Sequence, residues 1–173
     1  MHLAIVERFI DRLIDYKANV QRATPADLPS TIAAVCAARD IQRLVVPADL
    51  PKSWEPAGVM LLRDDELTNR QLDDSDGVLS GCALAIAQTG TIVLDSGSFH
   101  GRRAITLLPD YHLCVVRAEQ IIGLVPEAIE RLQETARRPI TFISGPSATS
   151  DIELNRVEGV HGPRTLDVLI IDT

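Results

Sequence analysis

Apolar side chains recur every three or four residues near the start of the chain, with charged side chains between them. Val6, Phe9, Ile10 and Leu13 fall on one side of a helix of that period. The pattern predicts an amphipathic helix over residues 3–21, whose apolar stripe packs on the rest of the protein. The edge of that stripe also suits contact with a partner subunit.

Three further helices are expected, over residues 30–38, 66–72 and 126–136. The first follows two prolines that break the preceding pattern, and Ser30 is a favourable residue to cap it. The second lies in an acidic segment, whose consecutive carboxylates lack the spacing of a metal-binding loop and indicate a solvated face. The last opens on Pro126, which is well tolerated in the first turn of a helix.

Short runs of aliphatic and β-branched residues predict the strands. These runs cover residues 43–46, 59–62, 84–87, 91–94, 105–108, 112–116, 140–143 and 166–171. Helices and strands alternate at both ends of the chain, which favours an α/β fold with a largely parallel sheet flanked by helices. Strands follow one another in the middle of the chain, so we expect a mixed sheet. The expectation is a single domain over residues 1–173, with a helical part at 1–40 and a motif-bearing part at 78–173.

The composition narrows the possible functions. The net charge of −7 and the pI near 5.0 disfavour nucleic-acid binding, and aromatic residues, at 3%, are too few to stack bases. Cys36, Cys82 and Cys114 are too scattered for a zinc or iron–sulfur motif, and we expect buried thiols in a reducing compartment. No apolar run approaches the ~20 residues that span a bilayer, and no signal peptide is recognised. We therefore expect a cytoplasmic protein without membrane contact.

The long connection between the last two predicted strands carries most of the candidate chemistry, because such loops are usually functional or disordered. Ser150 and Glu153 have the spacing of a capping box, which predicts a short helix after Ser150. One interpretation of these residues, and of Asp151, is therefore structural. The alternative is that Ser147 and Thr149 hold an anion at the N-terminus of that helix. No lysine follows the glycine as in a P-loop.

Four other residues permit both a structural and a functional interpretation. His161 lies between two nearby glycines, where it can approach a ligand and titrate near neutral pH, although a lone histidine is often structural. Gly90 indicates a hairpin or bulge, or a place where the backbone approaches a ligand. Arg102 and Arg103 are candidates for an anion clamp, or are surface arginines on a turn.

Four motifs are spread over residues 87 to 163. They are Ala-Gln-Thr-Gly-Thr at 87–91, Leu-Leu-Pro at 107–109, Ser-Gly-Pro-Ser-Ala-Thr-Ser-Asp-Ile-Glu at 144–153 and Gly-Val-His-Gly-Pro at 159–163. Their order and spacing resemble the signature of the LUD-domain family. The resemblance is specific from about Val78 to the end of the chain. It implies a fold similar to that of the CoA-transferase, ribose-5-phosphate isomerase and 5-formyltetrahydrofolate cyclo-ligase group.

Within that family the likeness is strongest to the lactate-utilization group. This implies a part in the oxidation of L-lactate to pyruvate, together with other lactate-utilization proteins that are the iron–sulfur subunits. It implies no redox centre, cofactor or metal in this chain, and no established catalytic residue. Many relatives have an acidic residue at the position of Gln88 and a basic one at Ala148. If those charges act in the relatives, their loss here weakens both an anion-binding and an acid–base role.

The motif residues are the candidate site, and segments 88–91, 144–151 and 159–163 are expected to line one pocket. The ligand-binding candidates are Thr89, Gly90, Thr91, Ser144, Gly145, Ser147, Thr149, Asp151, His161 and Gly162. The catalytic residues are unknown, with His161 and Glu153 as candidates for acid–base catalysis. A small carboxylate or a phosphate-bearing molecule is the expected ligand.

Three hypotheses for the function remain open. The first is a subunit of a lactate-oxidising system that has no turnover alone. The second is a stand-alone enzyme of the same fold group, acting on a phosphorylated, nucleotide or folate substrate. The third is a non-catalytic interaction module, which would present a flat or apolar surface in place of a pocket.

Overall fold

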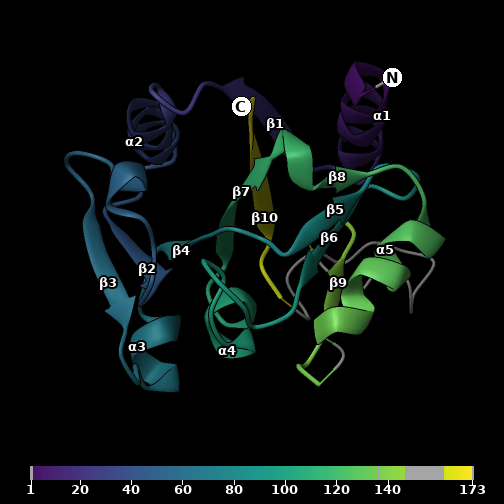
Figure 1. Ribbon diagram of the computed structural model, residues 1–173. Helices are drawn as coiled ribbons and strands as arrows, with labels where there is room; N and C mark the ends of the chain where they lie inside the picture. Colours follow the sequence, from purple (N-terminus) through teal and green to yellow (C-terminus); the bar gives the residue numbers. More distant parts are fainter. Residues whose placement is uncertain (1, 136, 147–161, 173) are drawn as a thin grey trace.

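The computed structural model describes residues 2–135, 137–146 and 162–172, which build two β-sheets (Figure 1). The larger sheet has six strands, all paired in parallel, in the order β1-β10-β7-β4-β2-β3. Its strands are β1 (Asn19–Ala23), β2 (Arg43–Pro47), β3 (Met60–Asp64), β4 (Gly77–Ser80), β7 (Tyr111–Arg117) and β10 (Thr165–Ile171). All six carboxyl ends therefore meet at one edge, where open α/β sheets usually bind ligands.

The smaller sheet is mixed and has the order β8-β5-β6-β9. Strands β5 and β6 form an antiparallel hairpin, β9 pairs antiparallel with β6, and β8 pairs parallel with β5. The strands are β5 (Leu84–Ile86), β6 (Thr91–Leu94), β8 (Ile121–Ile122) and β9 (Thr141–Ile143). The predicted α/β architecture with a largely parallel sheet is confirmed, although the antiparallel strands form a sheet of their own.

Helices cover both sheets. They are α1 (His2–Asp15), α2 (Leu28–Ala38), α3 (Asn69–Asp73), α4 (Arg103–Leu107) and α5 (Val125–Leu132), with short 3-10 helices at Lys52–Trp54, Ala118–Gln120 and Gln133–Thr135. In Figure 1, α2 and α1 lie on opposite sides of the larger sheet, and α5 lies beside the smaller one. Among the described residues, no helix combines the length and the apolar character needed to cross a membrane.

Alternate residues of the central strands enter two different cores. On β7, Cys114 and Val116 face a core shared with α1, β5 and β6, whereas Leu113 and Val115 face the core beneath α2. Helix α5 packs on the opposite face of the smaller sheet, and α4 packs against β2 and β4. The larger sheet is thus covered on both faces as predicted, but part of one cover is the smaller sheet.

The first predicted helix is too long. Helix α1 ends at Asp15, Lys17 adopts a left-handed φ of 63°, and residues 19–23 form strand β1 in parallel with β10. Backbone pairing with β10 decides this segment, which sequence period alone cannot reveal. The cap of α2 also differs, because Asp27 occupies the N-cap position and Ser30 lies within the helix, donating from Oγ to the Asp27 carbonyl oxygen.

The predicted strand at 105–108 is wrong, because residues Arg103–Leu107 form helix α4. Ile105 is fully buried there with Val45 and Val78, so one helical turn satisfies the same apolar residues. An apolar run this short does not distinguish a strand from a buried helix. Two other helices were placed nearly correctly: α3 begins after the capping residue Thr68, and α5 gives way to a 3-10 turn after Leu132.

Candidate functional site

Three hydroxyl groups from the smaller sheet form a continuous hydrogen-bonded chain. Thr91 Oγ1 lies 2.7 Å from Thr89 Oγ1 and 2.8 Å from Ser144 Oγ. Thr91 begins β6 and Ser144 follows β9, and the pairing of Ile92 with Ile143 brings them opposite each other. Thr91 is buried and the other two are half-buried. Each hydroxyl both donates and accepts, so the donor direction at one hydroxyl determines the donor direction at the next.

Thr89 ends this chain at a surface hollow of about 530 Å³. The hollow lies between the β5–β6 hairpin and the end of α1, and it is lined by Arg12, Asp15, Tyr16, Gln88 and Thr89. Arg12 Nη1 lies 3.2 Å from Asp15 Oδ2, with both side chains more than half exposed. An exposed ion pair of this kind contributes only about 0–1 kcal/mol. Arg12 can therefore exchange Asp15 for an anionic ligand at small cost.

Gly90 fixes the distance between the hairpin and α1. Its φ is 63°, and a Cβ at this position would lie 2.7 Å from Arg12 Cβ and 2.9 Å from the Arg12 carbonyl carbon. The close backbone approach proposed from the sequence is therefore made to a helix. The hairpin interpretation of this segment is confirmed by the antiparallel pairing of β5 with β6.

Gln88 is held from two directions at the edge of the hollow. Its backbone N–H donates to the Gly123 carbonyl oxygen at 3.1 Å, and its Oε1 accepts from the Val125 backbone N–H at 3.2 Å. Val125 is the first residue of α5, so the side chain satisfies a donor that the helix cannot satisfy itself. The amide of Gln88 thus has a structural role at the N-terminus of α5.

The structure brings together those predicted site residues that it describes. Thr89, Gly90 and Thr91 lie on the hairpin, and Ser144 and Gly145 follow the adjacent β9. A Cβ on Gly162 would lie 3.7 Å from the Pro146 carbonyl oxygen, so the two ends of the long connection meet beside this group. The remaining predicted residues lie outside the described residues: Ser147, Ala148, Thr149, Ser150, Asp151, Glu153 and His161.

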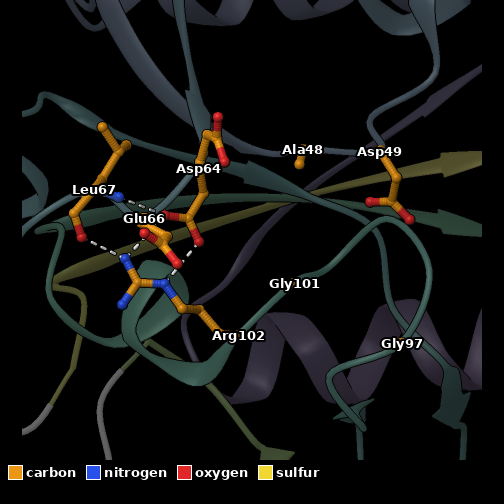
Figure 2. A pocket seen from close by; sticks show the side chains of 9 residues that line it. Ala48, Asp49, Asp64, Glu66, Leu67, Gly97, Gly101 and Arg102 are labelled. Carbon is orange, nitrogen blue, oxygen red and sulfur yellow. Dashed lines mark hydrogen bonds and ion pairs between the residues drawn. The ribbon is translucent and has the colours of Figure 1, made fainter.

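The two arginines proposed as an anion clamp have other partners. Arg102 makes a bidentate contact with Asp64, with Nε 2.7 Å from Oδ2 and Nη2 2.9 Å from Oδ1, and it also donates to the Leu67 carbonyl oxygen (Figure 2). Hydrogen bonds from Arg102, aided by its charge, lower the pKa of Asp64 although burial opposes them. Arg103 donates from Nη1 to Thr106 Oγ1. The structure therefore favours the structural interpretation of Arg102.

A second hollow, of about 540 Å³, adjoins the Arg102–Asp64 pair at the carboxyl ends of β2 and β3. Asp49, Asp65 and Glu66 also line it, so carboxylates outnumber the one guanidinium in its lining. Asp49 and Glu66 are drawn in Figure 2. Within the ranges that the structure describes, no three histidine, cysteine or acidic side chains are grouped so as to hold a metal ion. This hollow does not suit the anionic ligand expected from the sequence.

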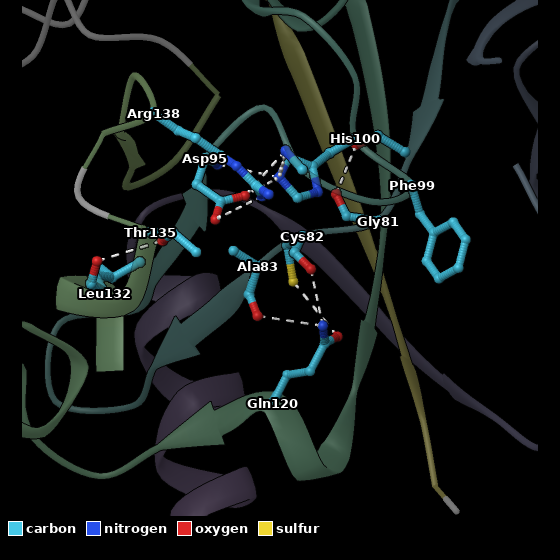
Figure 3. Close-up of polar contacts among 12 residues, drawn as sticks. Gly81, Cys82, Ala83, Asp95, Phe99, His100, Gln120, Leu132, Thr135 and Arg138 are labelled. Carbon is cyan, nitrogen blue, oxygen red and sulfur yellow. Dashed lines mark hydrogen bonds and ion pairs between the residues drawn. The ribbon is translucent and has the colours of Figure 1, made fainter. Parts of the chain in front are cut away.

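A buried acid–histidine pair follows β6 and was not singled out in the sequence. His100 Nε2 lies 2.7 Å from Asp95 Oδ1, and Arg138 Nη1 lies 3.8 Å from Asp95 Oδ2 (Figure 3). Burial acts to raise the pKa of Asp95, but hydrogen bonds from His100, Thr135 and the Gly97 backbone outweigh it and lower that pKa. The pair braces the turn between β6 and α4.

Arg12, Asp15 and Tyr16 are the site residues that sequence reasoning missed. Arg12 and Asp15 lie on the polar side of an amphipathic helix, where their side chains have the pattern of an ordinary solvated face, and Tyr16 follows directly after that helix. Nothing in that pattern indicates that these residues face the β5–β6 hairpin.

Comparison with known proteins establishes the family. The family model described as the LUD domain matches residues 6–171. The chain belongs to the LUD domain family. A protein named lactate utilization protein C, from Deinococcus radiodurans, is 48% identical over 170 residues, which cover 96% of this chain and 79% of that protein. The resemblance seen in the motifs is thereby confirmed.

Other relatives of this LUD domain are longer than the segment they share with it. Lactate utilization protein C of Shouchella clausii is 32% identical over 64% of this chain and 50% of its own length. The uncharacterized protein YkgG of Escherichia coli is 42% identical over 50% of this chain and 40% of its length. A crystal structure of a DUF162 family protein from Deinococcus radiodurans superposes with a TM-score of 0.86 and 40% identity, covering 99% of this chain and 98% of that one. The similarity in structure thus extends over almost the whole domain.

Proposed function

We propose that this chain takes part in lactate utilization as a subunit that binds a small anion and acts with other proteins that carry the redox centres. The role rests on one observation, the 48% identity over 96% of the chain to a protein named lactate utilization protein C. The anion, a carboxylate or a phosphate group, is supported by the hollow at which Arg12 and Thr89 meet.

The hydroxyl chain supplies the directional part of this binding. When Ser144 donates to Thr91 and Thr91 donates to Thr89, the Thr89 hydroxyl hydrogen is left to point at a ligand. An anionic oxygen in the hollow then accepts from both Thr89 and the Arg12 guanidinium. Each hydrogen bond to a charged group contributes about 1.5–3 kcal/mol, so the two together reach the roughly 4 kcal/mol of a weak, millimolar metabolite site.

Genetic complementation, together with an assay of the purified chain, tests the proposed role. A Deinococcus radiodurans strain that lacks its own lactate utilization protein C is complemented with this chain, and growth on L-lactate is measured. We expect growth to return, and we expect the purified chain alone to oxidise no lactate with an artificial electron acceptor. Turnover by the isolated chain would show an enzyme complete in itself. Failure of the folded, expressed chain to restore growth, where the deleted gene succeeds, would remove it from this pathway.

Binding tests the proposed site separately. Affinity for L-lactate, pyruvate and inorganic phosphate is measured by calorimetry for the wild type, Arg12→Gln and Thr91→Val. We expect Arg12→Gln to lower the affinity for the preferred ligand by about 10-fold or more, because the charge-assisted hydrogen bond is lost. Arg8→Gln removes the same charge from an exposed position of α1 outside the hollow, and Thr141→Val removes a hydroxyl outside the chain of three. Equal losses in the variants and their controls would contradict the site.

A further inference from the structure

A buried polar cluster lies between the sheets, apart from the hollow at Thr89. Ser80 Oγ lies 2.7 Å from His112 Nε2, and both side chains are almost fully buried. Cys114 lies two residues after His112 on the same face of β7, and the strand register pairs it with Ser80. The Cys114 thiol interacts electrostatically with the thiol of Cys82, and also with His112 and Ser80.

Backbone and side-chain contacts hold the two thiols beside each other. Cys114 Sγ lies 3.7 Å from the carbonyl oxygen of Gly81, the residue before Cys82. Gln120 Nε2 donates to the Cys82 carbonyl oxygen at 2.8 Å, and Cys82 Sγ lies 3.7 Å from Gln120 Oε1 (Figure 3). Two cysteines that are distant in sequence therefore lie on neighbouring segments of the same core, with Cys114 Sγ against the backbone that leads into Cys82.

The environment makes the two sulfurs unequal. Hydrogen bonds from Cys82, and then from His112 and Ser80, lower the pKa of Cys114 although burial opposes them. The same contact and burial raise the pKa of Cys82. A thiolate beside a thiol is the arrangement in which one sulfur reacts and the other resolves the product. Cys36 differs, because burial and then Asp167 raise its pKa to about 11.

We propose that Cys82 and Cys114 are a redox-active pair that hydrogen peroxide oxidises to an intramolecular disulfide. The Cys114 thiol loses its proton as its sulfur attacks one peroxide oxygen. The O–O bond breaks, and the released hydroxide takes up that proton and leaves as water, giving a sulfenic acid on Cys114. The Cys82 sulfur then attacks Cys114, and its proton leaves with the sulfenic hydroxyl as a second water. Two sulfurs each lose one electron and peroxide takes both.

The segment after β6 offers the path of access. The Gly81 N–H donates to the Phe99 carbonyl oxygen at 2.6 Å, so residues 96–101 cover the end of β4 beside the thiols. Ser96 and Phe99 adopt left-handed φ values of 56° and 69°, which non-glycine residues rarely hold without support from their surroundings. Local opening of residues 96–101, which breaks the hydrogen bond between Gly81 and Phe99, admits a molecule of the size of peroxide without unfolding of the sheets.

The first experiment treats the reduced, full-length protein with hydrogen peroxide, stops the reaction, and alkylates the free thiols after denaturation. We expect the product to lose two alkylatable thiols and two hydrogens in mass, with a peptide that links Cys82 to Cys114. Cys36 should remain alkylated and serves as an internal control. Three free thiols after treatment, or a link that includes Cys36, would overturn the proposal.

An equilibrium measurement does not depend on how fast an oxidant reaches the buried thiols. The wild type, Cys36→Ala, Cys82→Ala and Cys114→Ala are held in dithiothreitol redox buffers of increasing potential, with urea below the unfolding transition. We expect the wild type and Cys36→Ala to form the monomeric disulfide to the same extent, and the other two variants to form none. Absence of the disulfide from the wild type at the most oxidising potential would show that the two sulfurs cannot bond.

Discussion

Asp167 of β10 gathers side chains from three other parts of the fold around one carboxylate. Its Oδ2 lies 2.6 Å from Arg39 Nε and accepts from the Tyr111 hydroxyl at 2.8 Å, and its Oδ1 accepts from Asn19 Nδ2 at 2.8 Å. The Asp167 side chain is only 7% exposed, and the Arg39 guanidinium also stacks over the Tyr111 ring. These contacts connect β1, the end of α2 and β7 through a single buried charge.

Asp167→Ala should therefore lower the free energy of unfolding by about 3–5 kcal/mol, because it leaves Arg39 and Tyr111 without their shared acceptor. Urea unfolding followed by far-UV circular dichroism measures the loss. Asp15→Ala is the control, since it removes an exposed carboxylate paired with Arg12 and should cost at most about 1 kcal/mol. A similar small loss in both variants would show that the buried network contributes little.

The Asp64–Arg102 pair should make stability depend on pH. Arg102 holds the pKa of Asp64 below its usual value in the folded protein, so the unfolded chain binds this proton more readily. The stabilisation is complete above the unfolded pKa of about 3.9 and disappears as pH falls through the lower, folded pKa. The stability difference between the wild type and Asp64→Asn should thus be constant above about pH 5 and shrink below about pH 4. Urea titrations across this range measure the difference, and Asp65→Asn, at an exposed neighbouring position, is the matched carboxylate-to-amide control.

The motifs located part of the candidate site, and helix α1 supplied the rest. Thr89, Thr91 and Ser144 were chosen from two separate motifs, and strand pairing brings their hydroxyls together. Sequence reasoning could not supply Arg12, because its position opposite the hairpin depends on the packing of α1 against β1 and β8. Residues of one continuous motif can thus be recognised, whereas a side chain brought in by tertiary packing cannot.

At the scale of elements, the sequence pattern predicted most of the strands and failed on a few short segments. The buried strands β2, β7 and β10 follow mostly aliphatic runs, interrupted by His112 and Cys114 in β7 and by Asp167 in β10, and lie close to their predicted positions. Helix α4 and strand β8 are short segments whose conformation is decided by neighbours, α4 by β2 and β4 and β8 by β5. A few apolar residues satisfy either conformation, so the three-dimensional partner determines the outcome.

The junction between α1 and the β5–β6 hairpin offers a test with a matched pair of glycines. Gly90 and Gly58 both have left-handed φ values, 63° and 76°, but a Cβ meets the α1 backbone only at Gly90 and open space at Gly58. Gly58→Ala should cost about 1–2 kcal/mol for its backbone conformation alone. Gly90→Ala should cost about 1–3 kcal/mol more, because α1 must shift. Urea unfolding measures the loss of stability in both variants. Equal losses would mean that α1 accommodates the added Cβ at no measurable cost.

At the scale of the whole molecule, the two sheets share one core. Side chains from α1, from β7 and β10 of the larger sheet, and from β5 and β6 of the smaller sheet belong to the same buried cluster. Neither sheet has an alternative cover for these surfaces among the described residues, so separating them would expose apolar area on both. Loss of that burial is unfavourable, and the two sheets should unfold together.

Leu84→Ala tests this cooperativity from one end of the molecule to the other. Leu84 is buried beneath α5 on the smaller sheet, and Trp54, the single tryptophan, is buried with α2 on the larger one. The substitution should lower the free energy of unfolding by about 2–5 kcal/mol. If the sheets form one unit, Trp54 fluorescence and circular dichroism will shift to the same lower urea midpoint with an unchanged slope. Ile129→Ala, at a half-exposed position of α5, is the control and should lower the free energy of unfolding by no more than about 0.5 kcal/mol with either probe. A Trp54 transition that stays in place while an earlier phase appears in the dichroism would show two units that fold separately.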